Sequence, residues 1–168
     1  MKAILARRSI RKYLDKQIPR ESIELILEAG MAAPSAGNGQ PWQFLVINDK
    51  KLLKRISEIQ GHSQMLNEAS HAIIVCGDMN RKNKFVEDLW IQDCSAATEN
   101  MLIMVQDLGL GAVWLGTYPM EEVVNGMKDL FNLPEHIIPF SIVSLGYPAE
   151  EKAASNRFDE ARIHWNQW

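Results

Sequence analysis

Residues 87–116 read EDLWIQDCSAATENMLIMVQDLGLGAVWLG and join a long helical pattern to a strand that follows it closely. Along 87–108, apolar and small side chains recur at helical spacing in two adjacent stripes, and no Lys or Arg interrupts them. A helix with so wide an apolar surface is expected to be buried on most of its sides. Gly109 then predicts the helix end, and 112–116 is a predicted strand. The stripes are Trp90, Cys94, Ala97, Met101, Met104 and Leu108, and beside them Ile91, Ser95, Thr98, Leu102 and Val105.

Shorter helical and strand-like patterns flank this region on both sides. The residue before a proline avoids the helical conformation, so a helix that starts at Pro19 is expected to end before Pro34. Strand 137–146 contains Pro139, which favours a sheet edge or a strand start. Without an internal repeat or linker, the pattern predicts one α+β domain over 1–168, a sheet covered by helices whose strand order stays open. The other predicted helices cover 2–7, 50–59 and 120–131, and the other predicted strands cover 42–47 and 71–77.

Length and composition exclude several classes of protein. The 168 residues are 46% hydrophobic and 23% charged, which argues against a disordered chain, a collagen-like repeat or a coiled coil. Cys76 and Cys94 are too few for a disulfide scaffold and lie in apolar segments, so both are expected in the core. The four histidines lack ligand spacing, and no metal site is expected. We expect no membrane span and no signal peptide, and therefore a cytoplasmic protein.

The charge of the chain is unevenly distributed. Residues 1–20 carry seven Lys or Arg and one acid, although the whole chain has a net charge of −3. An acidic protein with one basic segment is not expected to bind nucleic acid broadly. The segment is suited to one small anion, or it is simply a solvated basic helix end.

Three segments are candidates for binding a ligand, and each has a plain structural alternative. In RRSIRKY (7–13), arginine side chains and a serine suit a phosphate, but a surface turn with ion pairs fits equally well. In APSAGNGQPW (33–42), small residues would let a flat ligand approach the backbone, or the segment is an ordinary loop. In WLGTYP (114–119), a strand stops at a glycine, as it also does in common strand-to-helix turns.

Taken together, these motifs resemble the FMN-dependent nitroreductase family, in its short-chain branch. The P-S-x-x-N-x-Q-P-W pattern is the most specific part of the resemblance, which covers nearly the whole chain in order. It implies a nitroreductase-like α+β fold, with a central, mostly antiparallel sheet flanked by helices. It also implies an intertwined homodimer with FMN at the subunit interface. The motifs are RRSIRKY (7–13), APSAGNGQPWQF (33–44), GLGAVWLG (109–116), SLGYP (144–148) and NRF (156–158).

The resemblance also implies roles for single residues. Arg7 and Ser9 would hold the FMN phosphate with help from Arg8, Arg11 would reach N1 and O2 of the ring, and Arg157 would be a second phosphate ligand. A main-chain N–H of Leu115 or Gly116, in the mid-chain turn, would face flavin N5. The ring contact that many relatives have at 60–68 matches weakly, and Gln64 or Asn67 would replace it. The turn residues are Trp114, Leu115 and Gly116, and the residues lining the flavin from the partner subunit are Pro34, Ser35, Ala36 and Asn38.

The implied activity is that of an FMN-containing NAD(P)H-dependent oxidoreductase. Hydride would reach N5 from NADH or NADPH and leave to a small acceptor such as a nitroaromatic or a quinone, in ping-pong turnover. This chemistry needs no acid or base from the protein, in keeping with the absence of a familiar catalytic motif. The alternatives are a reductive dehalogenase or flavin-destroying relative and a non-catalytic flavin-binding module. A binder of anionic peptides or nucleic acid is more remote. The sequence leaves open the acceptor and the choice between NADH and NADPH.

Overall fold

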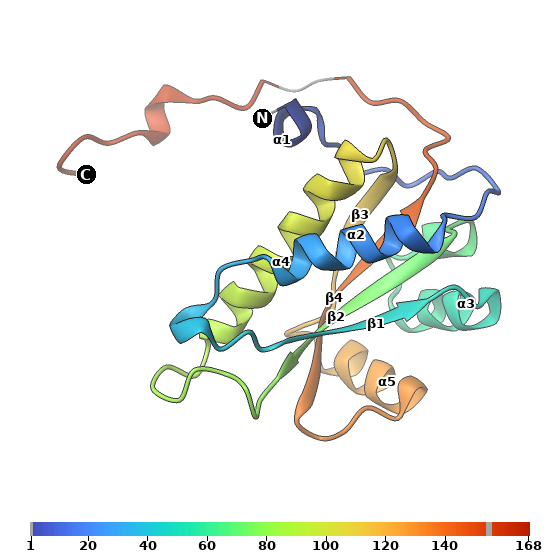
Figure 1. Ribbon diagram of the computed structural model, residues 1–168, viewed down its shortest axis with the longest axis horizontal. Helices are drawn as coiled ribbons and strands as arrows, with labels where there is room; N and C mark the ends of the chain where they lie inside the picture. The colour runs from blue at the N-terminus through green and yellow to red at the C-terminus, as the bar shows by residue number, and fades with distance from the viewer. Residues whose placement is uncertain (1, 154–155) are drawn as a thin grey trace.

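A four-stranded antiparallel sheet lies at the centre of the protein, whose computed structural model describes residues 2–153 and 156–168 (Figure 1). Every pair of neighbouring strands is antiparallel, which confirms the predicted α+β class and sheet type. The order β1-β2-β4-β3, which the sequence pattern leaves open, puts the third strand in sequence at an edge. The strands are β1 (Trp42–Ile47), β2 (His71–Asp78), β3 (Gly111–Gly116) and β4 (Ile137–Gly146).

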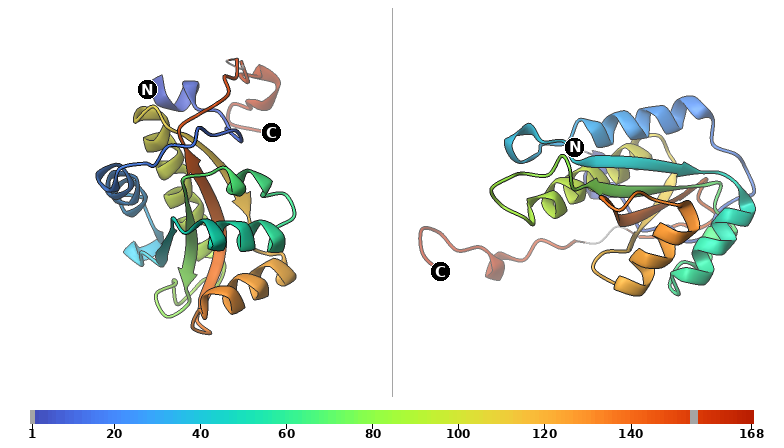
Figure 2. Two further views of the ribbon diagram at one scale, coloured as in Figure 1. Left: turned by 90° about the vertical axis from the view of Figure 1, so that its right-hand side faces the viewer. Right: turned by 90° about the horizontal axis from the view of Figure 1, so that it is seen from below.

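Helices cover both faces of this sheet. The five predicted helices are confirmed, with bounds that differ from the prediction by at most two residues; the long one, for example, begins at Leu89 rather than at 87. Helices α2 and α4 pack on one face, and α3 and α5 pack on the other (Figure 2). The helices are α1 (Lys2–Ala6), α2 (Arg20–Met31), α3 (Lys50–Ile59), α4 (Leu89–Asp107) and α5 (Glu121–Phe131), and the short turns are η1 (Ala36–Asn38), η2 (Gln64–Asn67) and η3 (Glu160–Arg162).

Strand β2 is buried along its whole length because both of its faces meet helices. Ile73 and Val75 pack towards α2 and α4, whereas Ile74 and Cys76 pack towards α3 and α5. This explains why the strand reads as an apolar run without alternation. Cys76 and Cys94 are both buried, as predicted, and burial raises the pKa of the Cys76 thiol to about 12.

The expectation that Pro139 marks an edge or a strand start is confirmed. Pro139 is the third residue of β4, and β3 pairs only with residues 141–146, so at Pro139 the strand is paired on the β2 side alone. The register between β2 and β4 shifts at Val75/Cys76, so Ser141 faces Val75 while Pro139 faces Cys76. An irregularity of this kind tolerates a residue that cannot donate a main-chain hydrogen bond.

Gly77 sits under an aromatic cluster and leaves no room for a side chain. A Cβ there would overlap the Trp90 ring and lie 2.9 Å from Met79 Cε. Trp90 is held by edge contacts to Tyr118 and Phe140, whose ring centroids lie 5.0 and 6.0 Å away. We therefore expect Gly77→Ala to lower the free energy of unfolding by about 1–3 kcal/mol through overpacking.

Denaturant unfolding of the Gly77→Ala variant tests this expectation. Gly61→Ala is the matched control, because a Cβ at Gly61 meets no atom within 4 Å. Equal stability of the two variants would contradict the packing argument.

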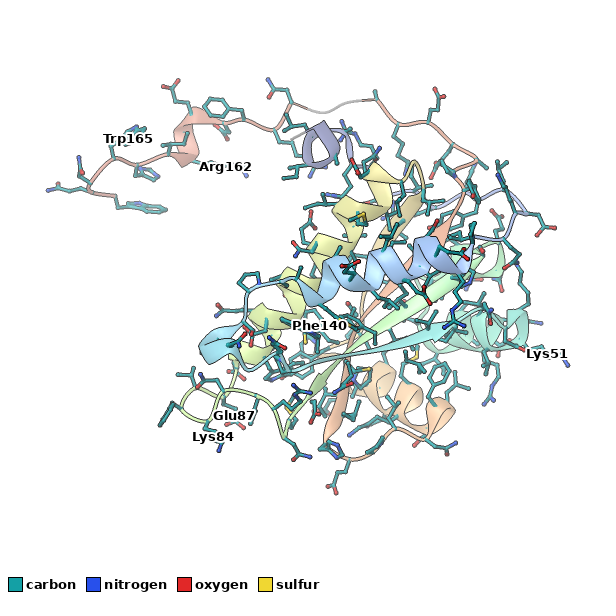
Figure 3. All side chains as sticks on the ribbon, in the orientation of Figure 1. Lys51, Lys84, Glu87, Phe140, Arg162 and Trp165 are labelled. Atoms are coloured by element: carbon teal, nitrogen blue, oxygen red, sulfur yellow. The ribbon has the colours of Figure 1, made fainter. Side chains whose placement is uncertain are left out.

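The chain after β4 first pairs with the N-terminal segment and then extends away from the helices. Residues 147–149 pair with 12–14, with the main-chain N–H of Leu14 donating to Tyr147 O at 2.9 Å. Residues 156–168 extend away from the helices, where Trp165 and Arg162 are exposed (Figure 3). Residues 154 and 155 lie outside the described range. In the part of the chain that the structure describes, no helix is long and apolar enough to cross a membrane.

Candidate functional site

The basic segment 7–13 is fixed against the edge strand β3. Ser9 bridges to Ala112 in parallel fashion, and the Ile10 N–H donates to Ala112 O at 2.9 Å. Tyr13 is buried, with its hydroxyl 2.8 Å from Ile10 O, and this burial raises the pKa of the phenol. These contacts position the intervening Arg11, whose own N–H donates to Glu150 Oε1 at 2.6 Å.

A cavity of about 630 Å³ joins Arg11 to the turn at the end of β3. It brings together five of the residues that the sequence analysis names, although they come from three separate segments. Gln64 lines it and Asn67 does not; the amide of Asn67 instead donates to Gln64 O at 3.1 Å. The predicted residues in the lining are Arg11, Gln64, Trp114, Leu115 and Gly116, and the others are Gln60, Gly61, His62 and Met65.

The lining of this cavity fits the ring of FMN. Gly116 is exposed, and a Cβ added there would meet Met120 Cε at 3.9 Å, so a flat ring has room to approach the backbone. Arg11 supplies a cation on the same cavity, which suits the negative charge that a reduced flavin ring carries. Of the predicted ring contacts, those on this chain are therefore compatible with the cofactor.

The remaining basic residues of the prediction meet at a second, smaller cavity. Arg7, Arg8 and Arg157 all line this space of about 230 Å³, beside α1 and the tail. Arg8 is already engaged with main-chain carbonyls, donating from Nε to Ala153 O at 2.9 Å. Arg7 Nε lies 3.4 Å from Glu99 Oε1. These placements leave the phosphate roles of the arginines as predictions.

Lys152 is a basic residue of the candidate site that the sequence analysis did not identify. Its Nζ donates to Ser9 O at 2.6 Å and lies 3.3 Å from Glu150 Oε1, so it sits within the basic motif. The residue lies 145 positions from Arg7 in the chain. The pairing of 147–149 with 12–14 and the hydrogen bonds from Arg8 to Ala153 and from Arg11 to Glu150 bring the two segments together. Gln60, His62 and Met65 were missed as well, because nothing in the pattern distinguishes them from ordinary residues after a helix.

The loop at 34–40 lies apart from both cavities and lines neither of them. Two short contacts hold its shape: Gln40 N donates to Ser35 Oγ at 3.0 Å, and Ala36 N donates to Asp93 Oδ1 at 2.9 Å. Asn38 has a φ of 55°, a left-handed conformation that Asn tolerates better than most residues. The predicted contacts of Pro34, Ser35, Ala36 and Asn38 with flavin are therefore not made to the ring cavity of the same chain.

Asp93 anchors this loop to α4 and is itself buried. We expect Asp93→Ala to lower the free energy of unfolding by about 1–3 kcal/mol, because the half-buried Ala36 N–H loses its acceptor. Asp93→Asn keeps that acceptor and removes the charge, so it should retain most of the stability. Chemical denaturation of the two variants measures the difference, and equal losses would show that the charge matters instead.

Comparison with known proteins identifies the family to which the chain is similar. The model of the Nitroreductase family matches residues 4–63 and 60–147. A protein of Archaeoglobus fulgidus, named "Putative NADH dehydrogenase/NAD(P)H nitroreductase", is 52% identical over 171 residues, covering 100% of this chain and 98% of its own length.

Two solved structures share the fold closely. An FMN-dependent nitroreductase of Clostridium difficile is 30% identical, with a TM-score of 0.92 and complete coverage of both chains. A structure from Desulfovibrio desulfuricans, described as a complex with FMN, is 32% identical with a TM-score of 0.84, covering 99% of this chain and 96% of that one. With the family match over most of its length, this chain belongs to the nitroreductase family.

Proposed function

We propose that this chain is an FMN-dependent NAD(P)H oxidoreductase that reduces small acceptors such as nitroaromatics or quinones. The observation that carries the proposal is the single cavity on which Arg11 and the Gly116 turn meet. Family membership and the names of the relatives, which include NAD(P)H nitroreductases and FMN-dependent enzymes, support it.

The residues of the chain would act by binding and by electrostatics. Bound FMN supplies the centre that accepts hydride from the nicotinamide and passes it to the acceptor. Arg11 would place a positive charge beside the ring, which becomes negative on reduction, and would so favour the reduced state. Arg7, Ser9 and Arg157 would hold the phosphate, with Arg8 and Lys152 keeping the main chain around them in place.

The cavity next to the turn supports a shared binding place, which the nicotinamide donor and the electron acceptor would occupy one after the other. We propose ping-pong turnover, in which the oxidised nicotinamide leaves before the acceptor binds. Initial rates with NADPH or NADH and a quinone, measured over a grid of both concentrations, test this. Parallel lines in double-reciprocal plots are expected, and lines that intersect would contradict the single shared site.

The protein is proposed to work as a homodimer in which the 34–38 loop of one subunit reaches the flavin of the other. The loop lies away from the ring cavity of its own chain, and α4 keeps a half-buried apolar side. Large apolar side chains are also exposed on α1 and the tail: Ile4, Leu5, Phe158, Trp165 and Trp168. Sedimentation at micromolar concentration should give twice the chain mass, and a monomeric mass would contradict the arrangement.

The alternatives considered from the sequence, a reductive dehalogenase relative and a non-catalytic flavin-binding module, are not favoured by the relatives found. The non-catalytic flavin-binding module would be favoured if the protein bound FMN but neither NADH nor NADPH reduced the bound flavin. The cytoplasmic location and the extent of the flavin-binding domain over 1–168 stay predictions.

A further inference from the structure

We propose that Gln60 is a positioning residue that fixes the main chain at Gly116, the residue whose N–H faces the flavin ring. The inference rests on the proposed function, because it assumes that the ring occupies the cavity lined by Arg11 and Gly116. Neither the family match nor the names of the relatives assign any role to Gln60.

Gln60 is buried and uses all four of its polar groups. Its side-chain Nε2 donates to Gly116 O at 3.0 Å, and its Oε1 accepts from the His62 N–H at 2.7 Å. Its own N–H donates to Ile56 O at 2.9 Å, and its carbonyl accepts from Ser63. The side chain and the main chain of this one residue thus link the end of α3, the 61–65 segment and the end of β3.

The contact with Gln60 reveals which main-chain groups of β3 face the cavity. In an antiparallel strand, the N–H and C=O of one residue point to the same side, and successive residues alternate. Ala112 O accepts from Ile10 and Gly116 O accepts from Gln60, so the even-numbered residues of β3 point away from β4. Of the two candidates for the N5 contact, Gly116 and not Leu115 therefore presents its N–H to the cavity side.

Gln60 consequently holds the carbonyl of the residue whose N–H is directed at the ring. A hydrogen bond from this neutral amide restrains the 116–117 peptide, and through the Gly116 Cα the N–H of the preceding peptide, without adding charge beside the flavin. The bond also links the turn to the 61–65 wall, where Gln64 and His62 line the same cavity. A reacting group that is displaced by about 1 Å can lose about 100-fold in rate, so the position of the Gly116 N–H matters.

Two substitutions separate positioning from general stability. Gln60→Glu keeps the acceptor for the His62 N–H but sets a carboxylate oxygen against Gly116 O, whereas Gln60→Met keeps the volume and removes both side-chain bonds. Gln43→Met is the matched control, since Gln43 is exposed on β1 and lines no part of this cavity. Each variant is purified with FMN and compared with the wild-type holoenzyme.

The measurements are the rate of flavin reduction by NADH or NADPH, the midpoint potential found by chemical reduction, and the free energy of unfolding. We expect both Gln60 variants to reduce at least about tenfold more slowly, with a shifted potential, while Gln43→Met matches the wild type. Loss of stability with wild-type rate and potential would overturn the proposal and leave a purely structural role. A wild-type protein that neither nicotinamide reduces would contradict the proposed function instead, and the potentials would still test Gln60.

Discussion

Arg11→Ala is expected to weaken FMN binding by about 10–100-fold and to make the potential of the bound flavin more negative. Arg11 is the arginine that lines the ring cavity, and its exposed side chain makes no hydrogen bond or ion pair with the described residues. A charge-assisted hydrogen bond contributes about 1.5–3 kcal/mol, and its loss falls most heavily on the reduced ring, which carries the negative charge. Flavin fluorescence titration and a redox titration of the variant measure the two effects.

Two control variants identify the origin of the Arg11 effect. Arg11→Lys keeps the positive charge but loses the planar guanidinium, so it should restore part of the potential and less of the affinity. Arg55→Ala removes the same charge from the exposed side of α3 and should leave both quantities as in the wild type. Wild-type affinity and potential in Arg11→Ala would show that the ring does not lie beside this residue.

Gly116→Val is expected to raise the dissociation constant of FMN by about 100-fold, equivalent to about 2.7 kcal/mol. The backbone at Gly116 accepts a side chain, because an added Cβ would meet Met120 Cε at 3.9 Å and crowd nothing in the protein. The added methyl groups would instead fill the space in which the ring approaches the backbone. Equilibrium dialysis against FMN measures the change.

Stability provides the internal control for Gly116→Val. A surface substitution without a clash should keep the free energy of unfolding within about 0.5 kcal/mol of the wild type. Gly116→Ala, with one methyl group, should show the same effect on FMN more weakly. A Val variant that binds FMN as tightly as the wild type would place the ring elsewhere and would also remove the basis of the Gln60 proposal.

Most of the fold could be predicted because its elements carry their own local signals. The stripes on α4, the apolar run of β2 and the glycine at 109 each specify a local structure through periodicity or backbone preference. The strand order could not be predicted, because it depends on which strands pair with each other after long connections in the chain. The register shift beside Pro139 could not be predicted either, because it depends on how β4 pairs with β2.

The candidate site was predictable where a motif carries it and not where the tertiary structure assembles it. Arg11 and Gly116 belong to recognisable motifs, and the structure brings them to one cavity. Gln60 and Lys152 have no motif, and their partners lie 56 and 143 positions away in the chain. Contacts of that range follow from the fold and leave no signal in a local pattern.

The central claim is that this chain carries electrons from a nicotinamide to a small acceptor through bound FMN. The most direct test is the visible spectrum of the FMN-loaded protein under anaerobic conditions, recorded before and after NADH or NADPH and again after a quinone. Bleaching by at least one nicotinamide and recovery of the oxidised spectrum with the quinone are predicted. A bound flavin that stays oxidised with both donors, or a protein that binds no FMN, would contradict the claim.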